Sequence, residues 1–221
     1  MKTVAFVPIR LNSKRVKNKN LREIQGVPLL KYILSSLRSV GNIDEVYVYC
    51  SDQAIKDLLP DGVNFLTRDS QLDGDYVKGE AIYRSFVNEV EADVYVLCHA
   101  TSPFLKADSI EDAVAQVRTG DFDSAFSAHR IQTFCWYEQE PINYSLNDIP
   151  RTQDLEPIYE ETSGFFIFKK ELLLEKSRRI GDKPYIKELS FIESIDIDTE
   201  EDFEIAQAVA NYYNLKEKYD V

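Results

Sequence analysis

The 221-residue sequence predicts an α/β fold, a three-layer sandwich in which a mostly parallel β-sheet lies between two layers of helices. Short β-rich apolar runs alternate along the chain with segments whose apolar residues recur at helical spacing. One of these runs, DVYVLC at Asp93–Cys98, is almost continuously apolar, as is typical of a central parallel strand. The length suits one domain with its own core, so we expect residues 1–221 to form a single unit.

The first third of the chain establishes the alternation. The run TVAFV at Thr3–Val7 is bounded by Pro8 and predicts a buried strand. Pro28 suits the first turn of a helix that continues to about Val40, where Gly41 stops it. We then expect strands at Glu45–Cys50 and Val63–Thr67, and helices at residues 53–59, capped by Ser51-Asp52, and at Lys78–Val90.

The remaining elements follow the same alternation. After the strand at Asp93–Cys98, Asp108 or Ser109 is expected to cap a helix. Later strands are expected at Asp123–His129, Ser163–Lys169 and Phe191–Asp198, and Thr199 is expected to cap a final acidic helix. Ligands of such sheets bind at the carboxyl ends of the strands, where the loop after the first strand, Ser51-Asp52 and His99–Pro103 fall. The sequence has neither G-x-G-x-x-G nor G-x-x-x-x-G-K-[ST], which disfavours a dinucleotide dehydrogenase or a P-loop ATPase.

One segment, Ile131–Arg151, interrupts the alternation. It is aromatic, contains prolines and the only Trp, and shows no helical period. We expect an extended arm leaving the sheet, because exposed aromatic side chains on such an arm usually contact a partner surface. A locally packed β-hairpin is the alternative interpretation of the same residues.

The charge pattern points to a small anionic ligand. The chain carries a net charge of −12, with a pI near 4.7, which argues against broad binding to nucleic acids or anionic membranes. Six bases nevertheless follow the first strand without one acidic residue, namely Arg10, Lys14, Arg15, Lys17, Lys19 and Arg22. This basic loop is suited to a polyanion such as a nucleoside triphosphate; a solvated charged loop is the alternative.

The sequence also allows expectations about the cellular compartment and the state of the cysteines. No run approaches the ~18 apolar residues that a membrane span requires, and no signal peptide is evident, so we expect a cytoplasmic protein. The three cysteines, Cys50, Cys98 and Cys135, are isolated in sequence, so neither a disulfide framework nor a zinc ribbon is indicated.

A pair of aspartates near the end of the chain is a candidate metal site. On a strand, Asp196 and Asp198 in SIDID would point to the same face, because residues two apart do so. Two carboxylates that close repel unless a cation lies between them, and Mg²⁺ is the expected cation. The alternative is that Asp198 caps the final helix and Asp196 is solvated.

The basic loop resembles a family signature. Arg10-Leu11-Asn12-Ser13-Lys14, followed by Lys19-Asn20, is similar to the R-x-x-S-K…K-N loop of the cytidylyltransferases that activate acidic sugars, and of the acylneuraminate cytidylyltransferases in particular. The similarity continues at intervals to about residue 210 and includes the S-I-D-I-D-T metal motif. It implies a Rossmann-like fold of the nucleotide-diphospho-sugar transferase type, CTP as substrate, Mg²⁺ as cofactor and a homodimer joined through an arm.

The resemblance also implies roles for individual residues. Nucleotide binding would fall to Arg10, Asn12, Ser13, Lys14, Lys19, Asn20, Arg68 and Asp75. Arg10 and Lys14 would lie near the phosphates and act catalytically with Asp198, because a triphosphate must be held by cations and hydroxyls. We interpret Arg15 and Lys17 as solvated charges. The segment around Arg68 departs from the family pattern, with Asp69 for a proline and Gly79 for a common serine.

The acceptor side departs further from the family. Candidate acceptor-binding residues are His99, Thr101, Arg151, Glu161 and Ser163. His99–Pro103, HATSP, is similar to Q-P-T-S-P with two changes, and a lone His there is either structural or catalytic. Glu161 and Ser163 stand where sialic acid synthetases carry an Arg and an Asn. One interpretation is that another base, Arg151 or Arg130, binds the carboxylate of the sugar acid. The interpretation that we favour is that Glu161 accepts a hydrogen bond from a hydroxyl or amine of the acceptor, which is then not N-acetylneuraminate.

These features predict transfer of a cytidylyl group from CTP to the hydroxyl of an acidic sugar, with release of pyrophosphate. Asp196 and Asp198 would hold Mg²⁺, and the basic loop would stabilise the leaving pyrophosphate. Two alternatives remain. One is a nucleotidylyltransferase of the same fold that acts on a sugar phosphate or a small phosphorylated acceptor, and the other is a noncatalytic nucleotide-binding protein.

Overall fold

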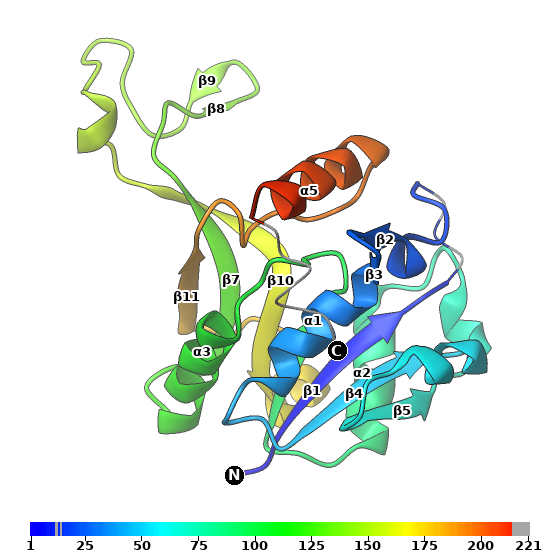
Figure 1. Ribbon diagram of the computed structural model, residues 1–221. Helices are drawn as coiled ribbons and strands as arrows, with labels where there is room; N and C mark the ends of the chain where they lie inside the picture. Colours follow the sequence, from blue (N-terminus) through cyan, green and yellow to red (C-terminus); the bar gives the residue numbers. More distant parts are fainter. Residues whose placement is uncertain (12, 14, 214–221) are drawn as a thin grey trace.

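The computed structural model describes residues 1–11, 13 and 15–213. Within that part of the chain, a seven-stranded sheet forms the centre, in the order β11-β7-β10-β6-β1-β4-β5 (Figure 1). Its strands are β1 (Thr3–Ile9), β4 (Glu45–Cys50), β5 (Val63–Thr67), β6 (Val94–Cys98), β7 (Ser124–Ile131), β10 (Ile158–Lys169) and β11 (Pro184–Leu189). Strand β10 runs antiparallel to both of its neighbours, and the other pairings in this sheet are parallel. The expected mostly parallel α/β sheet is confirmed.

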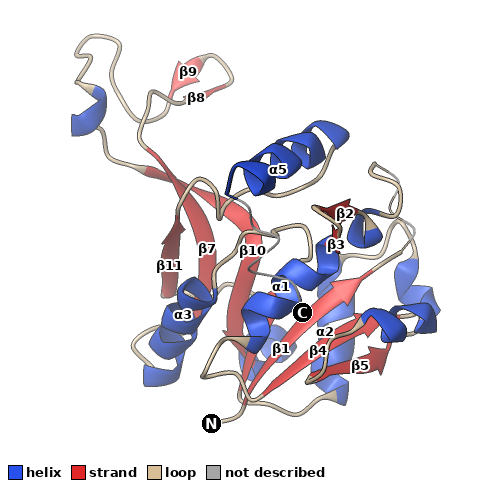
Figure 2. Ribbon diagram, viewed as in Figure 1, coloured by secondary structure: helices blue, strands red, loops and turns tan. Residues whose placement is uncertain are grey.

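Helices cover both faces of the sheet (Figure 2). Helices α1 (Leu29–Arg38) and α3 (Ala107–Thr119) pack on one face, and α2 (Gly79–Glu89) and α4 (Lys170–Lys176) pack on the other. Helix α5 (Glu200–Tyr213) belongs to a separate apolar cluster with the start of α1. None of the helices in the described residues is long and apolar enough to cross a membrane.

Strand β1 shows why the sheet needs both layers. Val7 and its alternate neighbours pack on the α1 and α3 side, whereas Val4 and Phe6 face α2 and α4. Phe6 stacks on Phe86 of α2, with ring centroids 4.2 Å apart. Full burial of a Phe side chain stabilises a fold by about 1.5–3 kcal/mol. Because β1 is apolar on both faces, it packs against both helix layers. Arg10 directly follows β1 and therefore lies at the carboxyl edge of the sheet.

Short elements complete the fold. The 3-10 helices are η1 (Lys19–Leu21), η2 (Gln53–Leu58), η3 (Ser70–Asp73) and η4 (Thr152–Asp154), and two small hairpins pair β2 (Glu23–Ile24) with β3 (Val27–Pro28) and β8 (Trp136–Tyr137) with β9 (Glu140–Pro141). Asp52 caps η2 as expected, by accepting from the Ala54 N–H at 2.9 Å, although the helix is 3-10 rather than α. Helix α3 begins at Ala107, so the expectation that Asp108 or Ser109 caps it is wrong.

The last strand differs from the sequence-based expectation. A strand at Phe191–Asp198 is wrong: β11 lies at Pro184–Leu189, and residues 191–198 form turns and irregular backbone. The alternating isoleucines of this stretch pack instead in the α5 cluster, where Ile197 is fully buried. Thr199 caps α5 as expected, because its Oγ1 accepts the Asp202 N–H at 3.2 Å and Asp202 accepts the Thr199 N–H at 2.7 Å.

Strand β10 contains an irregularity at the carboxyl edge of the sheet. Its register with β7 shifts between Glu161 and Phe166. The Ser127 hydroxyl fills the shift, where it lies 2.7 Å from Thr162 Oγ1 and accepts the Phe165 N–H at 2.9 Å. Shifts of this kind re-aim side chains and backbone groups next to sites. Here the Ser163 carbonyl faces His99 of the neighbouring loop.

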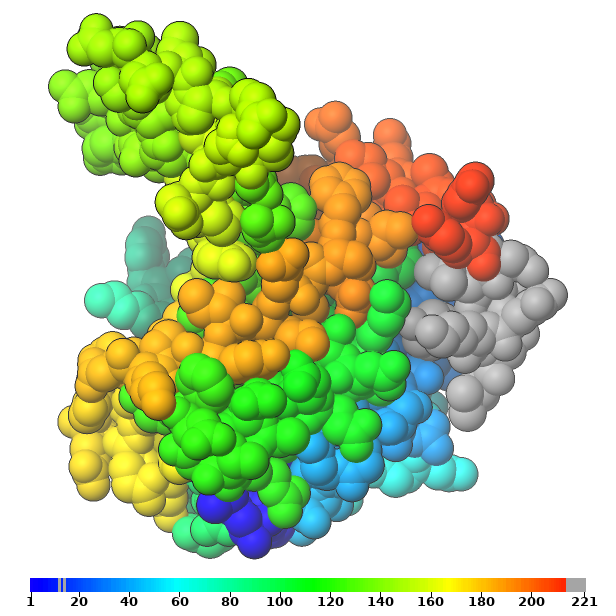
Figure 3. All heavy atoms as spheres, turned by 90° about the vertical axis from the view of Figure 1, so that its left-hand side faces the viewer, coloured from blue at the N-terminus to red at the C-terminus, as the bar shows by residue number. Residues whose placement is uncertain are grey.

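Residues 132–157 form an arm between β7 and β10 that stands away from the rest of the molecule (Figures 1 and 3). The arm contains the β8–β9 hairpin and an internal edge-to-face contact of Phe134 with Tyr144. Trp136 is nevertheless 50% exposed and Tyr137 is 69% exposed. The expected excursion from the sheet is present, and a small hairpin lies inside it.

The three cysteines are free, with Cys50 and Cys98 buried.

Candidate active site

A hollow lies at the carboxyl edge of the sheet, where β1, β5 and β6 end. It has a volume of about 280 Å³, near the lower bound of about 300 Å³ for small-molecule pockets. Its lining comprises Pro8, Ile9, Arg10, Arg68, Leu72, Gly74, Asp75, Val77, Ile82, Tyr83 and His99. Three residues expected at the nucleotide, Arg10, Arg68 and Asp75, therefore meet here together with His99. A volume of this size suits part of a nucleotide, with the remainder lying over the sheet edge.

Arg68 is the internal support of this hollow. Its buried guanidinium donates to the carbonyls of Ile9 at 2.7 Å and Tyr49 at 3.2 Å, and to Asp73 Oδ1 at 2.6 Å from Nη2 and 3.2 Å from Nε. Four of its five N–H donors are thus used within the protein. Arg68 joins the ends of β1 and β4 to η3, so it braces the hollow (hereafter the nucleotide hollow, after the residues expected there) and has one N–H donor left for a ligand.

Arg10 lies at the rim with its charge turned outward. Its Nη1 donates to the Asp73 carbonyl at 3.1 Å and to Asp75 Oδ1 at 3.3 Å, and its side chain is partly exposed. Ser51 donates to the Asp73 carboxylate, so the end of β4 braces the same turn. Arg10 is therefore held at the hollow by groups that leave the guanidinium accessible to an anion.

The basic loop is fixed at its far end. Asn20 is buried and donates from Nδ2 to the Arg10 carbonyl at 3.1 Å, which closes the loop onto the end of β1. Ser13 is partly buried, and its N–H donates to the Leu11 carbonyl at 3.0 Å. Asn12 and Lys14, both expected at the nucleotide, lie outside the described residues. Asn20 thus shapes the loop.

The aspartate pair meets the basic loop. Lys19 Nζ donates to Asp198 Oδ1 at 3.1 Å and to the Ile197 carbonyl at 2.5 Å, and Arg15 Nη2 donates to Asp198 Oδ1 at 3.0 Å. The interpretation of Arg15 as a solvated charge is therefore corrected, although its side chain is still 69% exposed. The Ile197 N–H donates to the Thr101 carbonyl at 2.9 Å, so Thr101 contributes a backbone anchor.

A buried glutamate anchors the approach to this pair. Glu193 accepts from the Ser109 hydroxyl at 2.7 Å, from Ser190 at 2.8 Å and from Lys106 Nζ at 3.2 Å. Burial raises its pKa, but these hydrogen bonds outweigh burial and hold the pKa below its ordinary value of 4.5. The carboxylate also accepts the Lys106 N–H at the start of α3. Glu193 therefore fixes the segment leading to Asp196 against helix α3.

The aspartate pair fits a divalent cation. Asp196 Oδ1 is buried and has no hydrogen-bond partner among the described residues, and such an atom is costly unless a ligand completes it. Those residues contain no cluster of three or more potential metal-ligating side chains. Asp198 Oδ1 already accepts from Lys19 and Arg15, so Asp196 Oδ1 is the open oxygen that suits Mg²⁺, which keeps waters and takes substrate phosphate oxygens as ligands. Asp196 and Asp198 would hold it.

His99 adopts one tautomer. Its Nδ1 lies 2.7 Å from the Ser163 carbonyl, so Nδ1 carries the proton and Nε2 is an acceptor. Burial lowers the His99 pKa, with Arg179 and Lys19 acting in the same direction, while Ser163 and Asp196 oppose the shift. The ring is thus neutral at pH 7. The Ser163 role is carried by its backbone, and His99 lies within the electrostatic reach of both Asp196 and Arg179.

The acceptor side contains one residue that sequence reasoning missed. Glu161 is paired with Arg179, whose Nη2 lies 2.6 Å from Glu161 Oε1. No spacing or motif in the KSRR stretch marks Arg179, because its position depends on how the turn after α4 folds back over β10. Arg151, by contrast, lies on the arm and pairs with Asp154, so the chain does not bring it to the other acceptor candidates.

The fold and the site define a nucleotide-binding α/β protein, with a basic loop and an aspartate pair at the carboxyl edge of a mostly parallel sheet. Residues 4–219 match the cytidylyltransferase family model. The chain belongs to the cytidylyltransferase family.

Individual relatives agree with this assignment. The chain is 29% identical over 213 residues to N-acylneuraminate cytidylyltransferase A of Danio rerio (92% of this chain, 49% of the relative) and 25% identical over 221 residues to pseudaminic acid cytidylyltransferase of Campylobacter jejuni (94% and 95%). A solved structure, CMP:2-keto-3-deoxy-manno-octonic acid synthetase complexed with CTP, shares the fold with a TM-score of 0.73 at 16% identity (96% of this chain, 100% of that chain). The chain spans about half the length of the N-acylneuraminate relatives it matches.

Proposed function

We propose that this chain transfers CMP from CTP to a hydroxyl group of an acidic sugar, with Mg²⁺ as cofactor and pyrophosphate as the second product. The observation that carries the proposal is the contact of the basic loop with the aspartate pair through Lys19 and Asp198, in a loop whose first residue, Arg10, lines the hollow. The relatives named above act on acidic sugars, as their names state, and this supports the acceptor class.

The reaction makes specific demands on the site. The acceptor oxygen forms a bond to the α-phosphorus while the bond from that phosphorus to the bridging oxygen breaks, and the hydroxyl proton passes to a base or to water. Negative charge then grows on the leaving pyrophosphate. Arg10 at the rim, with Lys14 of the same loop, supplies positive charge there, and such preorganised charge usually provides a large share of the rate enhancement.

The aspartate pair serves the other reacting group. Asp196 and Asp198 would hold Mg²⁺, which would offset the charge of the α-phosphate and lower the pKa of a nearby acceptor hydroxyl. Lys19 holds Asp198 and the Ile197 carbonyl in place, so the pair is oriented before substrate arrives. His99 offers its Nε2 acceptor at the hollow, where it can orient a hydroxyl of the nucleotide or of the acceptor.

The proposal extends to assembly and location. Residues 1–221 would act as one catalytic unit in the cytoplasm, and the arm would join two copies as a homodimer. The support for the dimer is the exposure of Trp136, Tyr137, Ile142, Leu146 and Ile149 on the arm. Apolar groups clustered on a projecting segment are typical of protein interfaces.

Pyrophosphate release tests the function. The protein is incubated with CTP and Mg²⁺ and, in turn, with N-acetylneuraminate, pseudaminate and 2-keto-3-deoxy-manno-octonate, and UTP, GTP and ATP replace CTP as controls. We expect release with CTP and at least one acid. Release only with a sugar phosphate would favour the alternative acceptor class. CTP binding without release for any acceptor would contradict the proposal and favour a noncatalytic binding protein.

A further inference from the structure

We propose that Arg179 binds the carboxylate of the acceptor and that Glu161 is its internal counter-ion, which the acid displaces. This inference rests on the proposed function, because it names the residues that select the acceptor of that reaction. It assigns the acid to neither Arg130 nor Arg151, the two bases considered from the sequence.

Arg179 is held rigidly before any ligand arrives. Its guanidinium carbon lies 3.7 Å from the centre of the Phe166 ring, and Phe166 is buried in β10. A cation stacked on an aromatic face is held in orientation without losing all its N–H donors. The Nη2 to Glu161 Oε1 bond of 2.6 Å uses one of the five donors. An arginine fixed in this way presents a fork suited to a carboxylate.

The pair with Glu161 is open to exchange. The Arg179 side chain is 36% exposed and that of Glu161 is 43% exposed. Exposed ion pairs are weak, because water competes for both charges. The carboxylate of an incoming acceptor can therefore take the place of the Glu161 carboxylate at Arg179. The charge of Glu161 is balanced in the free protein, so it does not by itself exclude an acidic acceptor.

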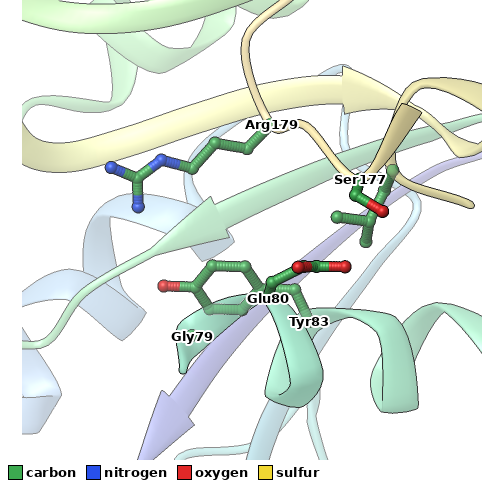
Figure 4. A pocket seen from close by; sticks show the side chains of 6 residues that line it. Gly79, Glu80, Tyr83, Ser177 and Arg179 are labelled. Atoms are coloured by element: carbon green, nitrogen blue, oxygen red, sulfur yellow. The ribbon is translucent and has the colours of Figure 1, made fainter. Parts of the chain in front are cut away.

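Arg179 opens into a pocket of about 310 Å³ that is lined by Gly79, Glu80, Tyr83, Leu173, Ser177 and Arg179. Figure 4 shows the Arg179 guanidinium and the Tyr83 hydroxyl at one end of this pocket, with Glu80 and Ser177 toward the other. At the second end Arg84 pairs with Glu80 at 3.1 Å and donates to Ser177 at 2.9 Å. The charged groups there pair with one another inside the pocket, whereas the partner of Arg179, Glu161, is not among the residues that line it.

The pocket adjoins the nucleotide hollow. Tyr83 lines both of them. His99 lines the nucleotide hollow, and the charges of Arg179, Asp196 and Lys19 all reach its ring. An acid held at Arg179 would therefore lie in the adjoining pocket, which shares Tyr83 with the nucleotide hollow. The volume of the pocket suits a single sugar ring.

The two partners predict opposite effects on acid binding. Arg179→Gln removes the charge that receives the acid, so affinity falls at least tenfold. Glu161→Gln keeps an acceptor oxygen for Arg179 but removes the competing charge, so affinity rises about threefold or more. A purely structural role for the ion pair would weaken binding in both variants.

The test is calorimetric titration of N-acetylneuraminate, pseudaminate and 2-keto-3-deoxy-manno-octonate into the full chain with CTP and EDTA. Arg178→Gln is the matched control, because Arg178 is the adjacent arginine and pairs with Asp182 instead. We expect wild type and Arg178→Gln to bind at least one of the acids, with affinities that agree within twofold. Arg179→Lys, which keeps the charge but not the fork, should recover part of the affinity lost in Arg179→Gln.

The outcomes separate this inference from the proposed function. Affinity of Arg179→Gln within threefold of wild type, weaker binding by Glu161→Gln, or no binding of any acid by wild type would overturn the inference. Pyrophosphate release by Arg179→Gln at the wild-type kcat/KM would also overturn it and leave the proposed function standing. Acid binding that depends on Arg179 without pyrophosphate release would support the inference and contradict the proposed function.

Discussion

Lys19 Nζ lies 3.1 Å from Asp198 Oδ1, although the two residues are 179 positions apart in the sequence. The same ammonium group donates to the Ile197 carbonyl, so it holds both the side chain and the backbone of the aspartate segment. Lys19 is only 12% exposed, in contrast to Arg15 on the same carboxylate. Lys19 is therefore the more buried member of this cluster, and Arg15 is the exposed member.

The aspartate pair should control metal dependence. We expect Asp196→Asn and Asp198→Asn each to abolish Mg²⁺-dependent turnover while the fold stays intact, because each removes a charge that would hold the ion. The measurement is pyrophosphate release across a Mg²⁺ titration, with circular dichroism as the fold check and the exposed Glu201→Gln as control. Near wild-type turnover of both variants at low Mg²⁺ would rule out the assignment.

The basic loop should act on the reacting phosphates. Lys14→Ala is expected to lower turnover about 10²-fold or more, the scale for removal of one preorganised stabiliser of transition-state charge. Lys17→Ala is the matched control, because Lys17 lies in the same loop and is exposed. Steady-state kinetics with CTP decide the point. A loss below about threefold for Lys14→Ala would demote it to a solvated charge.

The arm should hold two copies together. We expect a dimer by light scattering at tens of micromolar, and we expect Trp136→Ala combined with Tyr137→Ala to shift it toward monomer, since both side chains are exposed in the single chain. Tyr212→Ala, an exposed aromatic on α5, is the control that should leave the mass unchanged. A wild-type monomer, or a dimer indifferent to the arm variant, is the contrary result.

Glu193 should make stability depend on pH. Its pKa is lower in the folded chain than in the unfolded chain, so its contribution is present above about pH 4.5 and is lost as the pH falls below that value. Glu193→Gln should cost about 1–3 kcal/mol at pH 7, the scale for a buried charge-assisted hydrogen-bond set. The difference from wild type should shrink at pH 4.

Urea unfolding at both pH values measures this difference. The exposed Glu188→Gln in β11 serves as the control, because the structure gives it no comparable set of donors. A free energy of unfolding for Glu193→Gln that differs from wild type by the same amount at pH 4 and pH 7 would show that the carboxylate is not the group responsible.

Much of the sheet was predictable because the relevant signal is local. Strands β1, β4 and β6 follow from their apolar runs, and Thr199 follows from its position before an acidic turn. The final strand was predicted wrongly from the same kind of apolar run, because the isoleucines near Ile197 pack on α5 instead of in a sheet. The true edge strand, β11, is half exposed and carries a weaker apolar signal.

Contacts between segments that are far apart in the sequence were harder to predict. The aspartate pair was expected from the family motif to hold Mg²⁺ on a strand, and the structure instead places both aspartates on irregular backbone. Arg68 was expected at the nucleotide, yet its donors are committed to the ends of neighbouring strands, which only the packed sheet reveals. Arg179 has no pattern of its own, since Phe166 and Glu161 fix its position from another element.

The register shift in β10 bears on how chains of this kind diversify. The shift between Glu161 and Phe166 lies at the edge where the acceptor is proposed to bind, and beyond it Phe166 and Phe168 pair regularly with β6. The lining residues of the hollow come from other elements, and His99 joins the hollow to this segment through the Ser163 carbonyl. If the acceptor binds at this edge as proposed, exchanging residues 159–164 between family members should change the acceptor preference, and His99 is the residue through which such an exchange would also reach the hollow.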